Sequence, residues 1–133
     1  MPFVSITRLR VRSVRYLPAF IFYSVRSVRQ ASAAPGNISA ETFKDAGWVF
    51  WTRSVWRDEA SMRAFMTSGP HLRVMPHLLD WCDEAALVHW VQDSEDPAPW
   101  PEAHRRMLAE GRRSKVRHPS EAHRQFNIPA PRG

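Results

Sequence analysis

The sequence predicts a single α+β domain in which helices pack on an antiparallel sheet, and three observations support this class. The 133 residues are 44% hydrophobic and include fifteen aromatic side chains, enough for one core. Segments that alternate like strands or are rich in β-branched residues are followed along the chain by segments of helical periodicity. Turn residues separate these segments and give the order strand, helix, strand, strand, helix, strand.

The first half of the chain contains three expected strands and one helix. Residues 3–12 alternate as a strand, and residues 17–33 carry apolar side chains at helical spacing until an APGN turn ends the helix. A second strand is expected over residues 38–44. Residues 48–56 form the strongest strand, with apolar side chains on both faces. Because both faces need cover, we expect helices on one and a second subunit on the other.

The second half repeats this alternation. A helix is expected to begin within residues 57–66, a further helical stretch follows over residues 70–82, and residues 85–91 form the fourth strand. The complete order is the split βαβ pattern of a ferredoxin-like α+β sandwich. After an acidic, proline-rich linker, an additional C-terminal helix is expected over residues 101–111.

Charge is distributed unevenly along the chain, whose net charge is +6. Residues 1–34 carry six arginines and no acid, residues 35–103 have a net charge of −6, and residues 104–133 carry eight basic and two acidic side chains. No recognition motif accompanies the basic ends, so nucleic acid is not an expected partner. We expect the domain to span residues 1–111, and residues 112–133, which lack apolar periodicity, to form a basic, extended or flexible tail.

The cysteine content and the hydropathy of the chain indicate its cellular compartment. The only cysteine, Cys82, excludes an intrachain disulfide framework and a zinc site built on cysteine pairs. The apolar run at residues 17–25 is shorter than the roughly 20 residues that cross a bilayer, so we expect a helix of the fold there. A cytoplasmic protein without a membrane partner or a metal site is therefore expected. Glycine-rich nucleotide loops, HExxH, CxxC and Gly-x-Ser-x-Gly motifs are absent from the sequence.

One stretch resembles a known superfamily. Residues 50–71, FWTRSVWRDEASMRAFMTSGPH, are similar to the strand-to-helix signature of the dimeric α/β-barrel superfamily, which includes antibiotic-biosynthesis monooxygenases and uncharacterised relatives of spheroidene monooxygenase. The shared positions are Ser54, Trp56, Asp58, Ser61, Met62, Phe65, Ser68 and His71. The resemblance is moderately specific over residues 48–92, weaker over residues 3–47, and does not extend beyond about residue 112.

The resemblance implies a ferredoxin-like subunit that pairs sheet to sheet with a second copy. It also implies a ligand cleft between the sheet and its own helices. Activities in the superfamily include cofactor-free oxygenation of polycyclic phenols, haem-dependent chemistry and plain ligand binding, so the fold alone does not fix the function.

His71 stands at the histidine of this pattern. Its helical neighbours Val74 and Met75 place it on the apolar stripe that faces the sheet. A neutral imidazole there could hold haem iron or carry a proton. The alternative, which the sequence favours, is that it hydrogen-bonds a backbone carbonyl and caps the break at residues 68–69. In the haem-degrading members the iron-binding histidine would correspond to Met75, so that ligand does not carry over. His77, next to a proline, is expected on a flank or at the dimer surface.

Two tryptophans and a second histidine are further candidates. Trp51 and Trp90 could form walls of a pocket for a flat ligand, or they could pack in the core or a dimer interface. His89 lies on the fourth strand with Leu87 and Val91 on its face, so it is expected to line the cleft or the dimer interface.

Arginines on inner strands need an anionic or solvated partner. For Arg8 and Arg53, internal pairing with Glu41 or Asp45 would satisfy this need, and a ligand carboxylate or haem propionate would do so externally. Cys82 is a poor nucleophile candidate, because its acidic sequence neighbours raise a thiol pKa.

Together these observations predict a monooxygenase-like dimeric α/β-barrel protein that binds a hydrophobic, aromatic or polyene small molecule in the helix–sheet cleft. His71 is the expected catalytic or ligating residue, and the expected substrate-binding residues are Trp51, Trp90, Arg8, Arg53 and His89. Cofactor-free and haem-dependent chemistry both remain open. The alternative is a non-catalytic ligand-binding or interaction module whose basic tail binds an acidic partner.

Overall fold

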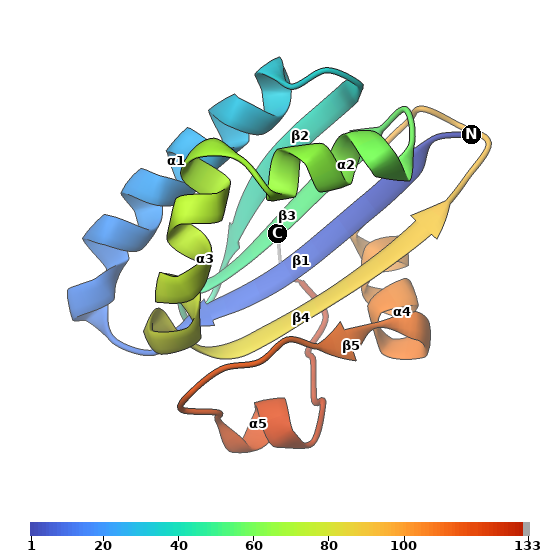
Figure 1. The fold of residues 1–133 in the computed structure, drawn as a ribbon. Coiled ribbons are helices and arrows are strands. Elements are labelled where there is room, and N and C mark those ends of the chain that lie inside the picture. Colours follow the sequence, from blue (N-terminus) through green and yellow to red (C-terminus); the bar gives the residue numbers. More distant parts are fainter. Residues whose placement is uncertain (132–133) are drawn as a thin grey trace.

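The structure is a computed structural model that describes residues 1–131, and it contains one five-stranded antiparallel sheet (Figure 1). The strands are β1 (Phe3–Val11), β2 (Asn37–Asp45), β3 (Val49–Trp56), β4 (Cys82–Val91) and β5 (Arg112–Arg113), in the order β2-β3-β1-β4-β5. The helices are η1 (Val14–Tyr16), α1 (Leu17–Ala33), α2 (Glu59–Met66), α3 (Gly69–Trp81), α4 (Trp100–Glu110) and α5 (Glu121–Arg124). The predicted α+β class and element order are confirmed.

Helices cover both faces of the sheet (Figure 1). Helices α1, α2 and α3 lie on one face, and α4 lies on the other. The first four strands and the helices between them form the ferredoxin-like unit, to which α4, β5 and α5 are additions.

Two residues, Asp58 and Gly69, determine where α2 and α3 begin. The carboxylate of Asp58 accepts a hydrogen bond from the backbone N–H of Ser61 at 2.8 Å and caps the first turn of α2. The hydroxyl of Ser61 donates to the same oxygen at 2.7 Å, and this bond, followed by the backbone bond, lowers the pKa of Asp58. Gly69 begins α3 with a φ of +59°, a left-handed conformation that side chains other than glycine rarely adopt. The chain therefore changes direction between the two helices, and α3 continues through Pro76.

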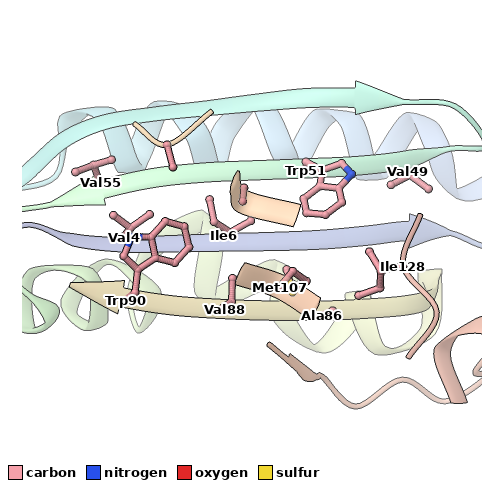
Figure 2. Close-up of a cluster of buried hydrophobic side chains, with 12 residues drawn as sticks. Val4, Ile6, Val49, Trp51, Val55, Ala86, Val88, Trp90, Met107 and Ile128 are labelled. Atoms are coloured by element: carbon pink, nitrogen blue, oxygen red, sulfur yellow. The ribbon is translucent and has the colours of Figure 1, made fainter. Parts of the chain in front are cut away.

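The sheet face opposite α1 to α3 holds the largest hydrophobic cluster (Figure 2). The sheet contributes Val4, Ile6, Val49, Trp51, Val55, Ala86, Val88 and Trp90, and the covering segment contributes Ala98, Ala103, Met107 and Ile128. This differs from the expectation that a second subunit covers the face, because the same chain supplies the cover. We call the segment from Ala98 to Ile128, which includes α4, the C-terminal cover.

The segment after α4 is attached to the sheet rather than extended away from it. Strand β5 pairs with β4, and the backbone N–H of Ser114 donates to the carbonyl of Ala85 at 2.9 Å. Ile128 is 6% exposed, and its carbonyl lies 2.7 Å from Nε2 of His104. The expected extended tail therefore differs from the structure over residues 112–131, since single buried apolar residues can hold a segment that lacks periodicity.

The remaining differences concern element boundaries. Strand β4 begins at Cys82, three residues before the predicted start, and α3 ends at Trp81. Burial, and then the neighbouring Asp83, raise the pKa of the Cys82 thiol to about 12, as expected for a poor nucleophile. Within residues 1–131, no helix combines the length and the apolar character needed to cross a membrane.

Candidate functional site

A cavity of about 130 Å³ lies between the sheet and helices α1, α2 and α3. Every one of the first four strands and all three helices contribute to its lining. The helices supply mainly apolar side chains, which are Phe20, Val28, Ala31, Met62, Phe65, Met66, Val74 and Leu78. None of the residues that line the cavity carries a carboxylate, an ammonium or a guanidinium group.

The floor of the cavity is rich in hydroxyl groups. Alternate residues of the central strands point toward the helices, and these are Ser5, Thr7, Thr42, Thr52 and Ser54. The register places them in rows, because Thr7 pairs with Thr52 on the neighbouring strand, and Thr52 pairs in turn with Thr42. The floor can therefore exchange several hydrogen bonds with a ligand while the roof contacts its apolar surface.

Helix α1 adds one more hydroxyl to the lining. The Oγ atom of Ser27 is buried, and it has no hydrogen-bond partner among the described residues. A buried polar atom without a partner costs free energy, and such groups mark a position where a water or a ligand is bound. Ser27 is therefore placed to donate a hydrogen bond to a ligand oxygen.

His71 lines the cavity at the start of α3 and is held by two neighbouring elements. Its backbone N–H donates to Oε1 of Gln30 at 2.9 Å, and Nε2 of Gln30 donates to the carbonyl of Ser68 at 2.7 Å. The Gln30 side chain on α1 thereby fixes the joint between α2 and α3. The imidazole lies 4.7 Å from the ring of Phe65, measured between centroids.

The hydrogen bond of the His71 ring assigns its tautomer. Nδ1 lies 3.2 Å from the carbonyl oxygen of Met66, and a carbonyl oxygen only accepts, so Nδ1 carries the proton. In the neutral ring Nε2 is then the proton acceptor, and no bond to it is made within residues 1–131. Burial lowers the pKa of His71, which keeps the ring neutral near pH 7. The site thus contains a base that can receive a proton.

His89 lies on the cavity floor, beside Ser5 in the strand register. Burial is the main cause that lowers its pKa, and the guanidinium groups of Arg112 and Arg63 lower it further. Its ring centroid lies 5.3 Å from that of Phe3. Of the two positions expected from the sequence, the cleft and the dimer interface, His89 therefore lies at the cleft.

The structure does not bring the other predicted site residues to the cavity. Trp51 and Trp90 belong to the hydrophobic cluster on the opposite face (Figure 2), where Trp51 is fully buried. Arg8 and Arg53 lie on the same opposite face, because side chains one residue apart in a strand point to opposite sides. These four residues therefore do not line the helix–sheet cavity. Their positions agree with the alternatives that the sequence left open, which are core packing for the tryptophans and internal pairing for the arginines.

Arg8 and Arg53 have internal carboxylate partners. Nη1 of Arg8 lies 2.7 Å from Oε1 of Glu84, and Nη2 of Arg53 lies 2.7 Å from Oε2 of Glu41. The pairing of Arg53 with Glu41 was one of the predicted options. Arg53 also donates to the carbonyl of Ala98 and therefore helps to fix the C-terminal cover.

Haem does not fit this site. The cavity volume of about 130 Å³ is far smaller than the macrocycle requires, and no cationic side chain lines it to bind propionates. Met75, the position implied by the haem-degrading relatives, is a partly exposed apolar residue that does not line the cavity. In the described part of the chain, no group of three His, Cys, Asp or Glu side chains could hold a metal ion.

The hydroxyl floor and Gln30 were not among the predicted site residues. The sequence carries a signal for the floor, since Ser5 and Thr7, and likewise Thr52 and Ser54, alternate with large side chains on two neighbouring strands. Gln30 could not be found in this way, because its role depends on the contact between α1 and the joint before α3.

Comparison with solved structures gives the same fold. The chain is similar to the Mycobacterium tuberculosis protein Rv0793, with a TM-score of 0.64 and 14% identity over 71% of this chain and 97% of that chain. It is similar to an antibiotic biosynthesis monooxygenase (TM-score 0.62, 13% identity, 69% and 99% covered). It is also similar to SnoaB, a cofactor-independent oxygenase from Streptomyces nogalater (TM-score 0.57, 14% identity, 70% and 94% covered). No family model and no curated protein matches the sequence.

The fraction of this chain that the solved structures cover matches the length of one stretch of the chain, from β1 to β4. Residues from Phe3 to Val91 are 89 of the 133 residues, close to the fraction that the solved structures cover. We infer that the C-terminal cover is an addition to the common fold. Over β1 to β4, the chain therefore has the fold of the antibiotic biosynthesis monooxygenases, as the resemblance at residues 50–71 implied.

Proposed function

We propose that this protein binds an uncharged hydroxylated aromatic molecule in the helix–sheet cavity and oxidises it with O₂, using His71 as the proton acceptor and no cofactor. The observation that carries this proposal is a cavity with an apolar roof and a hydroxyl floor, lined by a neutral histidine whose Nδ1 is bonded to a backbone carbonyl and whose Nε2 has no bond among the described residues. The fold shared with SnoaB, a cofactor-independent oxygenase, supports the reaction class.

The size of the cavity narrows the ligand class. Drug-sized ligands occupy pockets of about 300–1,000 Å³, whereas an apolar cavity of about 150 Å³ holds benzene. A volume of about 130 Å³ therefore supports a ligand of one ring, or of two rings if one end protrudes. This is smaller than the polycyclic phenols and polyenes considered from the sequence.

The lining also narrows the charge of the ligand. Bringing a carboxylate or phosphate into a buried site without a cationic partner is costly, and the cavity has no such partner. A phenolic hydroxyl is neutral on entry and needs only hydrogen bonds, which Ser27 and the floor can make.

The chain's own groups support a simple division of roles. Nε2 of His71 takes the hydroxyl proton, and the hydroxyl groups of the floor and Ser27 stabilise the resulting oxyanion. For 1-naphthol, O₂ then forms a C–O bond at the ring carbon para to this oxygen. That carbon loses its hydrogen, both hydrogens leave with the second oxygen atom as water, and the products are 1,4-naphthoquinone and water. The aromatic substrate is oxidised and O₂ is reduced, so no external reductant is required.

The experiment measures binding and turnover with 1-naphthol as the probe. Calorimetry should detect binding to the wild type, and an oxygen electrode should record O₂ uptake together with quinone formation. His71→Ala should remove turnover while the free energy of unfolding changes by only about 1 kcal/mol, the net value of one hydrogen bond. His77→Ala is the matched control, because His77 is exposed and lies outside the cavity. Turnover that survives in His71→Ala would disprove the catalytic role.

The non-catalytic alternative makes a different prediction in the same experiment. A pure ligand-binding protein would bind 1-naphthol without O₂ uptake, and His71→Ala would lower only stability. No contact in the described residues specifically supports the other alternative, in which the basic tail binds an acidic partner. The predicted homodimer and cytoplasmic location stay predictions, and the dimer would require a surface other than the face under the C-terminal cover. Light scattering that gives twice 15.4 kDa would support such a dimer.

A further inference from the structure

The solvent-facing side of α1 has an unusual composition. The exposed residues of this helix are Pro18, Ile21, Phe22, Val25, Arg26, Arg29, Ser32 and Ala33. Ile21, Phe22 and Val25 are 46%, 55% and 47% exposed, and Val14 just before the helix is 62% exposed. Helices on protein surfaces normally present polar and charged side chains of both signs to water. This face instead combines large apolar side chains with arginine and contains no acidic residue.

The arginines of the N-terminal third separate into two groups. Arg8, Arg10 and Arg12 lie within 4 Å of the carboxylates of Glu84, Asp83 and Asp80. Arg15, Arg26 and Arg29 are exposed and form no ion pair with any carboxylate of residues 1–131. The unpaired group is the one on and beside α1.

The positions of the unpaired arginines match those of the exposed apolar side chains. Arg26 follows Phe22 by one helical turn, and its guanidinium lies 5.5 Å from the centre of the Phe22 ring. Arg29 follows Val25 by one turn in the same way. The long stems of arginine can pack on apolar surface while the charged ends reach outward. The face therefore presents large apolar side chains with the positive charges of Arg29 among them and Arg26 beside them.

Charge complementarity identifies the occupant. A second copy of this chain would bring its own unpaired arginines against Arg26 and Arg29, so self-association through this face is opposed by repulsion. An anionic lipid surface offers negative headgroups for the arginines and an acyl boundary for Phe22 and Val25. We infer that α1 docks this protein, through its outer face, on anionic membrane surfaces.

This inference goes beyond the proposed function and stands without it. It also differs from the expectation of no membrane partner, which rested on the absence of a spanning segment. The same helix lines the cavity with Phe20, Ser24, Ser27 and Val28 on its inner face. Docking of the outer face would hold the cavity within one helix diameter of the lipid, the phase in which an uncharged aromatic molecule concentrates.

Co-sedimentation of the full chain with vesicles tests the inference. The wild type should sediment with vesicles of phosphatidylcholine and phosphatidylglycerol in equal parts, and much less with pure phosphatidylcholine, and high salt should release it. Arg26→Glu/Arg29→Glu and Phe22→Ser/Val25→Ser should each lower the bound fraction by about tenfold. All these side chains are exposed, so the melting temperature should stay unchanged.

Matched controls separate this face from general charge and hydropathy. Arg73→Glu/Arg105→Glu changes the same charge at exposed positions of α3 and α4, and Leu72→Ser/Leu108→Ser removes side chains that are 49% and 50% exposed. Both controls should bind like the wild type. Equal loss in the controls, or no sedimentation of the wild type with the mixed vesicles, would overturn the inference. So would a dimer in vesicle-free solution that Phe22→Ser/Val25→Ser dissociates, because the face would then be a self-interface.

Discussion

The two faces of the sheet are built from the same strands but have opposite properties. On β3, Thr52 and Ser54 line a cavity, whereas Trp51 and Arg53, which alternate with them along the strand, are buried against the C-terminal cover. Between Phe50 and Trp56, which pack on the helices, the first face is lined by small hydroxyl side chains and leaves space. The other face is filled by indole rings and branched side chains. The candidate site therefore depends on small polar side chains of one face, whereas Trp51 and Trp90 on the other face belong to the largest hydrophobic cluster.

The largest expected effect comes from the filled face. Trp51→Ala should lower the free energy of unfolding by about 3–5 kcal/mol, because it removes a fully buried indole and leaves a void under α4. Urea denaturation followed by circular dichroism measures the change. A loss below about 1 kcal/mol would mean that this face is not the main source of stability.

A second prediction concerns the segment that completes the filled face. Truncation after Gly111 removes the buried Ile128 together with α5, and it should cost about 2–5 kcal/mol, the range for losing a large aliphatic side chain from a core. Differential scanning calorimetry should show a melting temperature lower by several degrees. An unchanged melting temperature would instead support the prediction from the sequence that these residues form a flexible tail.

The buried histidines predict a smaller, pH-dependent effect. Burial lowers the pKa of His71 and of His89, so each binds a proton more readily in the unfolded chain than in the folded one. Their contribution to stability is therefore complete above the ordinary pKa of about 6.5 and is lost as the pH falls below it. Urea denaturation between pH 7 and pH 5 should show this decline, and it should be weaker in His71→Gln/His89→Gln. Parallel curves for the two proteins would contradict the assignment.

The smallest expected change in stability belongs to the cavity face. Thr52→Val keeps the shape of the side chain and removes a hydroxyl that faces the cavity, so the free energy of unfolding should change by less than about 0.5 kcal/mol. Calorimetry with 1-naphthol should nevertheless show weaker binding, because a floor hydrogen bond is lost. Unchanged binding would mean that the hydroxyl floor does not contact the ligand.

Local patterns were sufficient to predict most of the fold. The alternation in residues 48–56 and the signature at residues 50–71 predict the strand, the start of α2 and the cavity histidine, because each depends on neighbours in the sequence. The pattern showed that both faces of β3 are apolar, but not what covers them. The cover came from residues 98–128, whose contacts with the sheet depend on the path of the whole chain.

The site was predictable for the same reason only in part. His71 and His89 lie at the cavity because their own helix and strand positions point them there. Trp51, Trp90, Arg8 and Arg53 were assigned to the cleft from their chemistry, although strand alternation places them opposite Thr52 and Ser5. Ser27 and Gln30 required knowledge of how α1 lies against its neighbours.

The C-terminal cover has a consequence for the order in which the protein is made. Strands β1 to β4 are synthesised before residues 98–128, so a nascent chain that has already formed its sheet carries one uncovered apolar face. Such a face is the kind of surface that aggregates or recruits chaperones. The face stays uncovered until the segment from Ala98 to Ile128 has been translated. Slow codons within that segment should therefore reduce the soluble yield more than slow codons placed before β1.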